Sequence, residues 1–156
     1  MILRPAVDSD RDLTFAWAND PLTRAMSFST APIAAEDHAR WFAKALTGVV
    51  RRLFIAEYEQ EPFGILRIDF LDPEHRAAEV GINLAPSARG RGLALPALAA
   101  LSRVARELGV EKLVARIKPE NTASIRSFEK AGYRPTSSAA EEASLCYELS
   151  LGAPSA

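Results

Sequence analysis

The sequence predicts an α+β fold, a mixed and mostly antiparallel sheet with helices on both faces. Three apolar, strand-like runs between residues 51 and 85 are separated only by short turns, which is typical of an antiparallel meander. From Glu79 to Ile117 a strand, a glycine-rich turn, a helix and a strand form a βαβ unit, so its two strands should be parallel. We expect one domain over residues 1–151 and a flexible tail at 152–156.

A short strand at residues 2–6 and three helices, at about residues 8–20, 21–27 and 34–46, are expected before the meander. The first helix has a polar residue at its start, and the second begins with a proline. The third carries apolar residues at i, i+3, i+4 and i+7 spacing, which predicts one buried stripe. The residues concerned are Asp8 or Ser9 as the first cap, Leu13, Ala16 and Trp17 on the inner side of the first helix, Pro21, and His38, Trp41, Phe42, Ala45 and Leu46 on the third.

Two helices and two strands are expected after the glycine-rich turn. "KLVARI" and "SLCYELSL" have the composition of strands. The helix between the turn and "KLVARI" presents one apolar face and ends at a glycine, and the helix after that strand begins at an asparagine and is also followed by a glycine. These residues are Leu93, Ala97, Leu101, Val104, Leu108 and Gly109 for one helix, and Asn121 and Gly132 for the other.

Composition excludes several classes of protein. The net charge of −1 provides no basic field for nucleic-acid binding. Cys146 is the one cysteine and there are two histidines, so we expect no internal disulfide and no metal site. The N-terminus becomes charged too early for a secretory signal, and no apolar stretch is long enough to span a membrane. The expected compartment is the cytoplasm.

The segment "APSARGRGLALP" has two glycines among arginines just ahead of a long helix. A helix N-terminus presents free backbone N–H groups and a partial positive charge, and glycines let an anion approach that backbone closely. The spacing fits neither a P-loop nor the dinucleotide fingerprint. The pattern therefore favours a site for a phosphate-bearing ligand, although a plain strand-to-helix turn with solvated arginines has the same composition.

Two segments carry a resemblance to a known family. Arg89, Gly92 and Ala94 in "RGRGLA" resemble the R/Q-x-x-G-x-G/A motif of the GNAT N-acetyltransferase family. "NTASIRSFEKAGY" resembles that family's second segment, an Asn at a helix start and a Gly-aromatic pair at its end. The resemblance in organisation extends over nearly the whole chain. It implies the GNAT acyl-CoA N-acyltransferase fold, with a sheet that splays at two central parallel strands, and acetyl-CoA as cofactor, released as CoA.

By this resemblance, the pyrophosphate of acetyl-CoA would bind the backbone at the glycine-rich turn. The pantetheine arm would lie between the splayed strands and satisfy their unpaired N–H and C=O groups. Asn121 would reach the arm from the other side, and it could serve as a helix cap at the same time. The implied cofactor-binding residues are Ile82, Asn83, Leu84, Arg89, Gly90, Arg91, Gly92, Leu93, Ala94, Asn121, Ser124 and Phe128.

Two familiar acid–base groups of the family are absent. Many relatives have a tyrosine seven residues after the helix-start Asn, where it protonates the departing thiolate; here Phe128 cannot do so. Arg116 replaces the glutamate that some members carry five residues before that Asn. Tyr133 and Tyr147 are candidate acids, each with a packing role as the alternative. Water could also protonate a thiolate, since a thiol pKa is about 8.5.

Glu79 is the candidate general base. It alternates with Gly81 and Asn83, so the three side chains point to the same side of a strand that leads into the cofactor site. The alternative is a surface or ion-paired glutamate. Backbone N–H groups near Leu84 are the candidate donors to the developing oxyanion.

The acceptor is expected to be a small molecule with a primary amine. "WANDPLTRAMSF" followed by "HARWF" resembles the acetyltransferases of the pseudaminic-acid pathway, which act on the 4-amino group of a UDP-linked amino sugar. An arginine can bind a diphosphate, a histidine can donate to oxygens, and aromatic rings can stack on uracil. Each residue also has a structural alternative as core, cap or surface charge. The candidates are Trp17, Asn19, Arg24, Phe28, His38 and Trp41.

Two other functions remain open at this stage. A protein N-terminal acetyltransferase of the ribosomal-protein type predicts an acidic, open acceptor groove. A non-catalytic CoA-binding module predicts tight binding without turnover. Neither nucleic acid nor membrane is expected as a partner, and a homodimer is left open.

Overall fold

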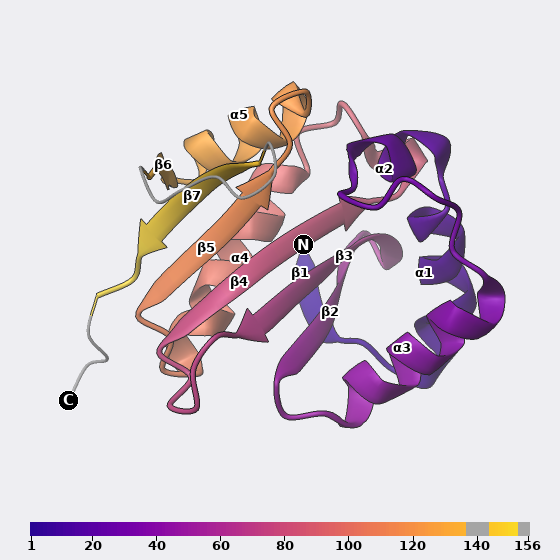
Figure 1. Ribbon diagram of the computed structural model, residues 1–156, viewed down its shortest axis with the longest axis horizontal. Helices are drawn as coiled ribbons and strands as arrows, with labels where there is room; N and C mark the ends of the chain where they lie inside the picture. Colours follow the sequence, from indigo (N-terminus) through magenta and orange to yellow (C-terminus); the bar gives the residue numbers. More distant parts are fainter. Residues whose placement is uncertain (137–143, 153–156) are drawn as a thin grey trace.

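The computed structural model describes residues 1–136 and 144–152, which form one sheet with helices on both faces (Figure 1). The strand order is β1-β2-β3-β4-β5-β7-β6, and only β4 and β5 run parallel to each other. The α+β fold and the meander are therefore confirmed. Of the expected tail, residues 153–156 lie outside the described residues. The strands are β1 (Ile2–Pro5), β2 (Arg51–Tyr58), β3 (Glu61–Phe70), β4 (Ala77–Leu84), β5 (Lys112–Ile117), β6 (Arg134–Pro135) and β7 (Leu145–Ser150).

The parallel pair parts as the sequence resemblance implies. β4 and β5 are paired from Ala77 and Lys112 to Glu79 and Val114, which makes three residue pairs. Beyond them β4 continues to Leu84 and β5 to Ile117 without pairing to each other. The unpaired halves of two central strands leave backbone groups that an inserted ligand can satisfy.

Alternation along the strands gives the sheet two differently covered faces. On β2, Leu53 and Ile55 face α3 and pack with Phe42 and Ala45 of that helix. The opposite face is the main core, which α4 and α5 cover; Figure 1 shows α4 behind the strands and α1 to α3 beside β2 and β3. The helices are α1 (Arg11–Ala18), α2 (Pro21–Met26), α3 (Ala35–Thr47), α4 (Ala94–Glu107) and α5 (Thr122–Lys130).

The start of α1 differs from the prediction. A 3-10 turn at Asp8–Asp10 precedes the helix, and Asp10 accepts the backbone N–H of Val7 at 2.8 Å, so neither Asp8 nor Ser9 is the cap. The turn advances the chain by about 120° per residue, which rotates the helix that follows. The predicted inner face was therefore wrong in part: Thr14 and Trp17 are buried, whereas Leu13 and Ala16 are exposed.

The ends of α4 and α5 lie close to where the sequence predicts them. Asn121 caps α5 by accepting the backbone N–H of Ser124 at 3.2 Å. Gly109 and Gly132, which follow α4 and α5, have φ of +86° and +99°, a conformation that only glycine adopts without strain. Leu108 is the one residue of the predicted α4 face that stays largely exposed, since it lies at the final turn.

Candidate functional site

The glycine-rich turn presents an open backbone surface at the start of α4. Gly90 and Gly92 both have φ of +71°, and a Cβ on either would meet no atom within 4 Å. Leu93, at the N-cap of α4, gives no side-chain hydrogen bond to the helix start, and the first turn holds no acidic residue. The amides of this turn are thus free of side-chain caps and face an open space, which fits an anion such as a pyrophosphate.

Arg89 ties this turn to α2. Its guanidinium donates to Asp20 Oδ2 at 2.5 Å and to Thr23 Oγ1 at 2.9 Å. Thr23 in turn donates to Asn83 Oδ1 at 3.1 Å, at the end of β4. The hydrogen bond from Arg89 holds the pKa of Asp20 below its usual range. Arg89, the arginine of the motif, therefore joins the glycine-rich turn to α2, and Thr23 joins α2 to β4. Arg91 is exposed.

The remaining predicted cofactor residues fall into two groups. Ile82, Asn83 and Leu84 are half-buried and lie on the part of β4 that pairs with β3 but not with β5. Asn121 and Ser124 lie at the start of α5, which follows β5. Ile82 to Leu84 thus border the gap between the parted strands.

Phe128 lies in the main core and is 2% exposed. Its ring packs edge-on against Tyr133 at a centroid distance of 4.9 Å. Tyr133 and Tyr147, the candidate acids, belong to the same core, and burial raises the pKa of both hydroxyls. These three rings therefore pack on the α4 and α5 side of the sheet.

A cavity of about 540 Å³ opens on the other face, between α1 to α3 and the strands β2 to β4. Most of its lining is apolar, and two of its lining residues, Ile82 and Asn83, also border the gap between the parted strands. Three of the predicted acceptor residues, Arg24, His38 and Trp41, line this cavity. The full lining is Thr14, Ala18, Thr23, Arg24, Ser27, Ile33, Asp37, His38, Trp41, Leu53, Ile65, Arg67, Gly81, Ile82 and Asn83.

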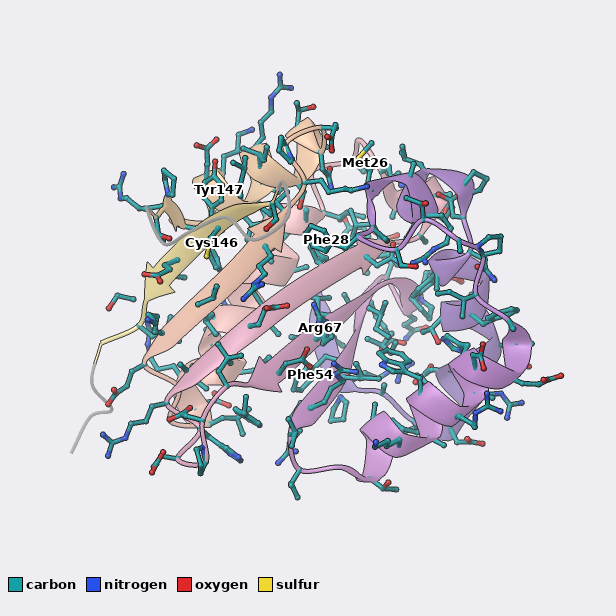
Figure 2. All side chains as sticks on the ribbon, viewed as in Figure 1. Met26, Phe28, Phe54, Arg67, Cys146 and Tyr147 are labelled. Carbon is teal, nitrogen blue, oxygen red and sulfur yellow. The ribbon has the colours of Figure 1, made fainter. Side chains whose placement is uncertain are left out.

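Three predicted acceptor residues lie outside the lining. Trp17 is 6% exposed and belongs to the main core. Asn19 exchanges two hydrogen bonds of 2.8 Å with the backbone of Ile33, which fixes the loop between α2 and α3. Phe28 is 56% exposed. Figure 2 places it near the upper end of β4, beside α2.

Arg24 lines the cavity but is already engaged. Its Nε donates to the Ala18 carbonyl at 2.7 Å, and its Nη1 donates to the Ser29 carbonyl at 3.0 Å. Nη2 donates to Ser27 Oγ at 3.1 Å. The guanidinium therefore organises the loop after α2.

A row of alternating charges crosses the open face of the sheet, where Figure 2 shows Arg67. Arg51 donates to Asp69 at 2.5 and 3.1 Å, and Asp69 also binds Arg67. Glu79 lies 3.6 Å from Arg67 Nη2 and 3.3 Å from Arg116 Nε. Glu79 thus has a guanidinium at each carboxylate oxygen, and it is not part of the cavity lining.

Gly81 makes the position of Arg67 possible. A Cβ at Gly81 would lie 2.7 Å from Arg67 Nη2, which is closer than real Cβ contacts come. Arg67 is paired across the sheet with Gly81, so its side chain crosses β4 there to reach Glu79. Sequence reasoning missed Arg67 and Asp69 because only the register between β3 and β4 brings them next to the predicted residues.

Within the described part of the chain, no three His, Cys, Asp or Glu side chains gather where a metal ion could bind. Across those same residues, every helix is too short or too polar to span a lipid bilayer.

The comparison with protein families identifies the family of the chain. Residues 1–134 match the family model described as the acetyltransferase (GNAT) domain. The chain belongs to the GNAT acetyltransferase family. As a GNAT enzyme it uses acetyl-CoA as the acetyl donor and acetylates an amine acceptor.

Individual GNAT relatives agree in length as well as in fold. YwnH of Bacillus subtilis (strain 168), a candidate phosphinothricin acetyltransferase, is 30% identical over 138 residues, which cover 85% of this chain and 83% of that protein. A crystal structure of a candidate phosphinothricin N-acetyltransferase has a TM-score of 0.79 and 26% identity, covering 97% of this chain and 98% of its own. The aminoglycoside acetyltransferase AAC(6')-Ib, solved with coenzyme A and kanamycin, has a TM-score of 0.82 at 19% identity, covering 95% of this chain and 93% of its own, which is a likeness of fold.

Proposed function

We propose that this GNAT enzyme acetylates the primary amine of a compact acceptor that carries an acid group, such as the carboxylate or phosphinate of a phosphinothricin-like amino acid. The observation that carries the proposal is the guanidinium of Arg67 at the wall of the cavity. A planar guanidinium binds a carboxylate, phosphinate or phosphate through two parallel hydrogen bonds. The 30% identity to YwnH supports the same class of acceptor.

The charge balance of the cavity agrees with this proposal. Among its described lining residues, Arg24 and Arg67 are cationic and Asp37 is the one acidic residue. Asp37 is ion-paired with Arg40, and Arg67 with Asp69 and Glu79, so the lining carries no excess of negative charge. A polycationic acceptor such as an aminoglycoside, or the N-terminus of a basic protein, would need more carboxylates than this lining offers.

The cofactor would be held by the predicted residues of the glycine-rich turn, of β4 and of the start of α5. The backbone from Gly90 to Ala94 would bind the pyrophosphate, and Ile82 to Leu84 with Asn121 and Ser124 would flank the pantetheine arm. Bound there, acetyl-CoA supplies an activated acetyl thioester. The N–H groups of β4 near Leu84 would stabilise the charge that develops on the carbonyl oxygen, and the apolar walls of the cavity would exclude water from the amine.

Glu79 has a positioning role in this proposal, in place of the catalytic role that its strand position suggested. Its two oxygens lie beside Arg116 and Arg67, at 3.3 and 3.6 Å. Together with Asp69, it holds the Arg67 guanidinium in one place against the flexibility of the arginine side chain. A fixed guanidinium loses less conformational entropy when it binds an anion.

A UDP-linked 4-amino sugar is the second candidate acceptor. The cavity volume of about 540 Å³ exceeds what an amino acid needs, and the half-exposed Trp41 offers a ring face on which uracil could stack. Against it, every guanidinium nitrogen of Arg24, which would bind the diphosphate, already donates a hydrogen bond. Among the described residues, Arg67 donates a hydrogen bond through Nη1 alone, to Asp69.

The test is thiol release from acetyl-CoA with a panel of four acceptors: phosphinothricin, a UDP-linked 4-amino sugar, kanamycin and an N-terminal peptide of a ribosomal protein. We expect the highest kcat/KM with phosphinothricin or a related acidic amino acid. Arg67→Gln should raise KM for that acceptor about 10- to 100-fold, the range expected for one charge-assisted contact.

Arg52→Gln is the matched control, because Arg52 lies on β2 with its guanidinium over Phe70, away from the cavity lining. It should leave the KM for the acceptor and the KM for acetyl-CoA unchanged. Preference for kanamycin or the peptide, or an unchanged acceptor KM in Arg67→Gln, would contradict the proposal. Turnover of the sugar nucleotide alone would select the second candidate.

A further inference from the structure

The cavity contains few groups that could take a proton from the acceptor. Most of a primary amine is an ammonium ion at neutral pH, so it must lose a proton before it can attack a thioester. Among the described lining residues, only Asp37 and His38 have side chains that can act as a base. The Asp37 side chain is 64% exposed and paired with Arg40, and Glu79 lies outside the lining. His38 is the remaining candidate.

His38 is buried yet faces the cavity. It is 5% exposed, and its ring lies among Phe15, Trp41 and Phe42 at centroid distances of 5.2, 5.8 and 5.7 Å. Nδ1 is fully buried and has no hydrogen-bond partner. Nε2 is not a fully buried atom without a partner, so of the two ring nitrogens it is the one that can face the cavity that His38 lines. A buried side-chain nitrogen without a hydrogen-bond partner, as Nδ1 is here, is uncommon in folded proteins.

The surroundings keep this imidazole neutral at pH 7. Burial lowers the pKa of His38 below 6.5; the charge of Arg11 lowers it further, and that of Asp12 opposes the change. A neutral imidazole has one nitrogen with a free lone pair, as a proton acceptor requires. Three aromatic rings next to the cavity can also stabilise a transient positive charge. Other charged residues on the elements that surround the His38 ring include Arg24 of α2, Asp37 of α3 and Arg67 of β3, which line the cavity, and Arg51 of β2, which lies over Trp41.

We propose that Nε2 of His38 accepts the proton that the acceptor ammonium loses. The ammonium N–H bond breaks, a new N–H bond forms at Nε2, and the electron pair stays on the amine nitrogen. That pair forms the bond to the acetyl carbon, and Nε2 releases its proton to water. As the carbon–sulfur bond breaks, the amine nitrogen of the adduct loses a second proton, which passes to the departing thiolate directly or through water. The assignment depends on amine acetylation and not on the acid group of the acceptor.

The first test is the pH dependence of kcat/KM, with the best acceptor of the panel, for the wild-type enzyme and two variants. The wild-type enzyme should lose activity with a one-proton limb below pH 6.5. His38→Gln should lower kcat about 100-fold, abolish that limb, and leave the KM for acetyl-CoA unchanged. His75→Gln is the matched control, since the second histidine stacks on Phe70 at 3.8 Å outside the cavity lining. A limb that persists in His38→Gln would overturn the assignment.

The second test needs neither turnover nor the His38 variant. The chain has two histidines, so the His75→Gln protein shows the His38 ring alone in a two-bond ¹H–¹⁵N spectrum. We expect a neutral ring at pH 7.5 with the proton on Nδ1, because the surrounding π electrons attract an N–H and repel a lone pair. A proton on Nε2 would overturn the proposal. Failure of every amine in the panel while Nε2 is unprotonated would overturn the proposed acceptor class, whereas a protonated Nε2 would overturn the His38 assignment whatever the panel shows.

Discussion

Asp10 ties the first strand to the first helix. Its carboxylate receives two hydrogen bonds from Arg4, at 2.8 and 2.9 Å, and a third from the backbone N–H of Val7 at 2.8 Å. The side chain is 8% exposed. The hydrogen bond from Arg4 keeps the pKa of Asp10 below its usual value of 3.8, against the opposing effect of burial. One buried carboxylate thus fixes where the chain turns from β1 into α1.

We expect Asp10→Asn to lower the free energy of unfolding by about 2 kcal/mol, because a buried charge-assisted pair is lost. Urea denaturation at pH 7 measures this change. Since the folded state lowers the pKa, the carboxylate stabilises the protein above pH 3.8 and this contribution disappears as the pH falls below that value. The variant should therefore lose less stability than the wild-type protein between pH 5 and pH 2.

Asp12→Asn is the control for Asp10→Asn. The Asp12 side chain is 89% exposed, so its replacement should change stability by less than about 0.5 kcal/mol. Equal effects of the two replacements would show that Asp10 does not hold the turn.

Single residues were predicted well where the signal was local. Helical spacing alone predicted that His38 and Phe42 share a buried stripe, and a helix start predicted the cap at Asn121. Arg67 was missed because its neighbours Glu79 and Gly81 come from another strand. Cross-strand register depends on turn geometry and packing, which one sequence does not display.

At the level of elements, the turn from β4 into α4 has the most direct link to cofactor binding. Gly92 takes the left-handed conformation, and the space above it is open. We expect Gly92→Glu to abolish measurable acetyl-CoA binding, because the variant adds backbone strain, bulk and a negative charge where the pyrophosphate would bind. Isothermal titration with CoA gives the affinity.

Gly109→Glu is the matched control for this turn. Gly109 also has positive φ and open space at its Cβ position, and it follows the opposite end of the same helix. The control should cost similar backbone strain and leave CoA affinity within about twofold. Normal binding by Gly92→Glu, or equal loss in both variants, would rule out an anion site at this turn.

Elements with a clear hydrophobic period were predicted close to their observed bounds, as the three strands β2, β3 and β4 show. The first helix was less accurate, because the 3-10 turn at Asp8–Asp10 shifts its phase. β6 was not predicted, since two residues carry no period at all. The predicted acceptor residues scattered for a related reason: Trp17 and Asn19 neighbour the cavity along the chain, while their side chains serve the core and a loop.

On the scale of the whole molecule, the sheet is joined at its centre by three residue pairs, with α4 packed behind it. A ligand that binds across the gap would therefore stabilise the complete fold. At a concentration 100 times its Kd, a ligand specific for the folded state adds about 2.7 kcal/mol. For a chain of this length, we expect acetyl-CoA to raise Tm by about 5–10 °C.

Differential scanning fluorimetry with and without acetyl-CoA measures this shift, and Gly92→Glu provides the control that should show none. An unchanged Tm at saturating acetyl-CoA in the wild-type protein would contradict binding across the parted strands.

The topology was predictable as far as chain order determines it. The meander and the parallel βαβ pair follow from short turns and from a crossover helix. The position of β7 between β5 and β6 did not follow, because it depends on which edge the last strand finds free. The parting of β4 from β5 came from the family resemblance, since no residue pattern encodes a missing ladder.

The parted strands give this sheet an edge in its interior. Proteins protect the outer edges of sheets with short strands, charges or bulges, because an open edge recruits other extended chains and promotes aggregation. Along β4 and β5 beyond Glu79 and Val114, any bulge or side chain that filled the gap would exclude an amide-bearing arm. The bound cofactor would then protect this edge, so the cellular concentration of the cofactor would determine how often the edge is open to other protein chains.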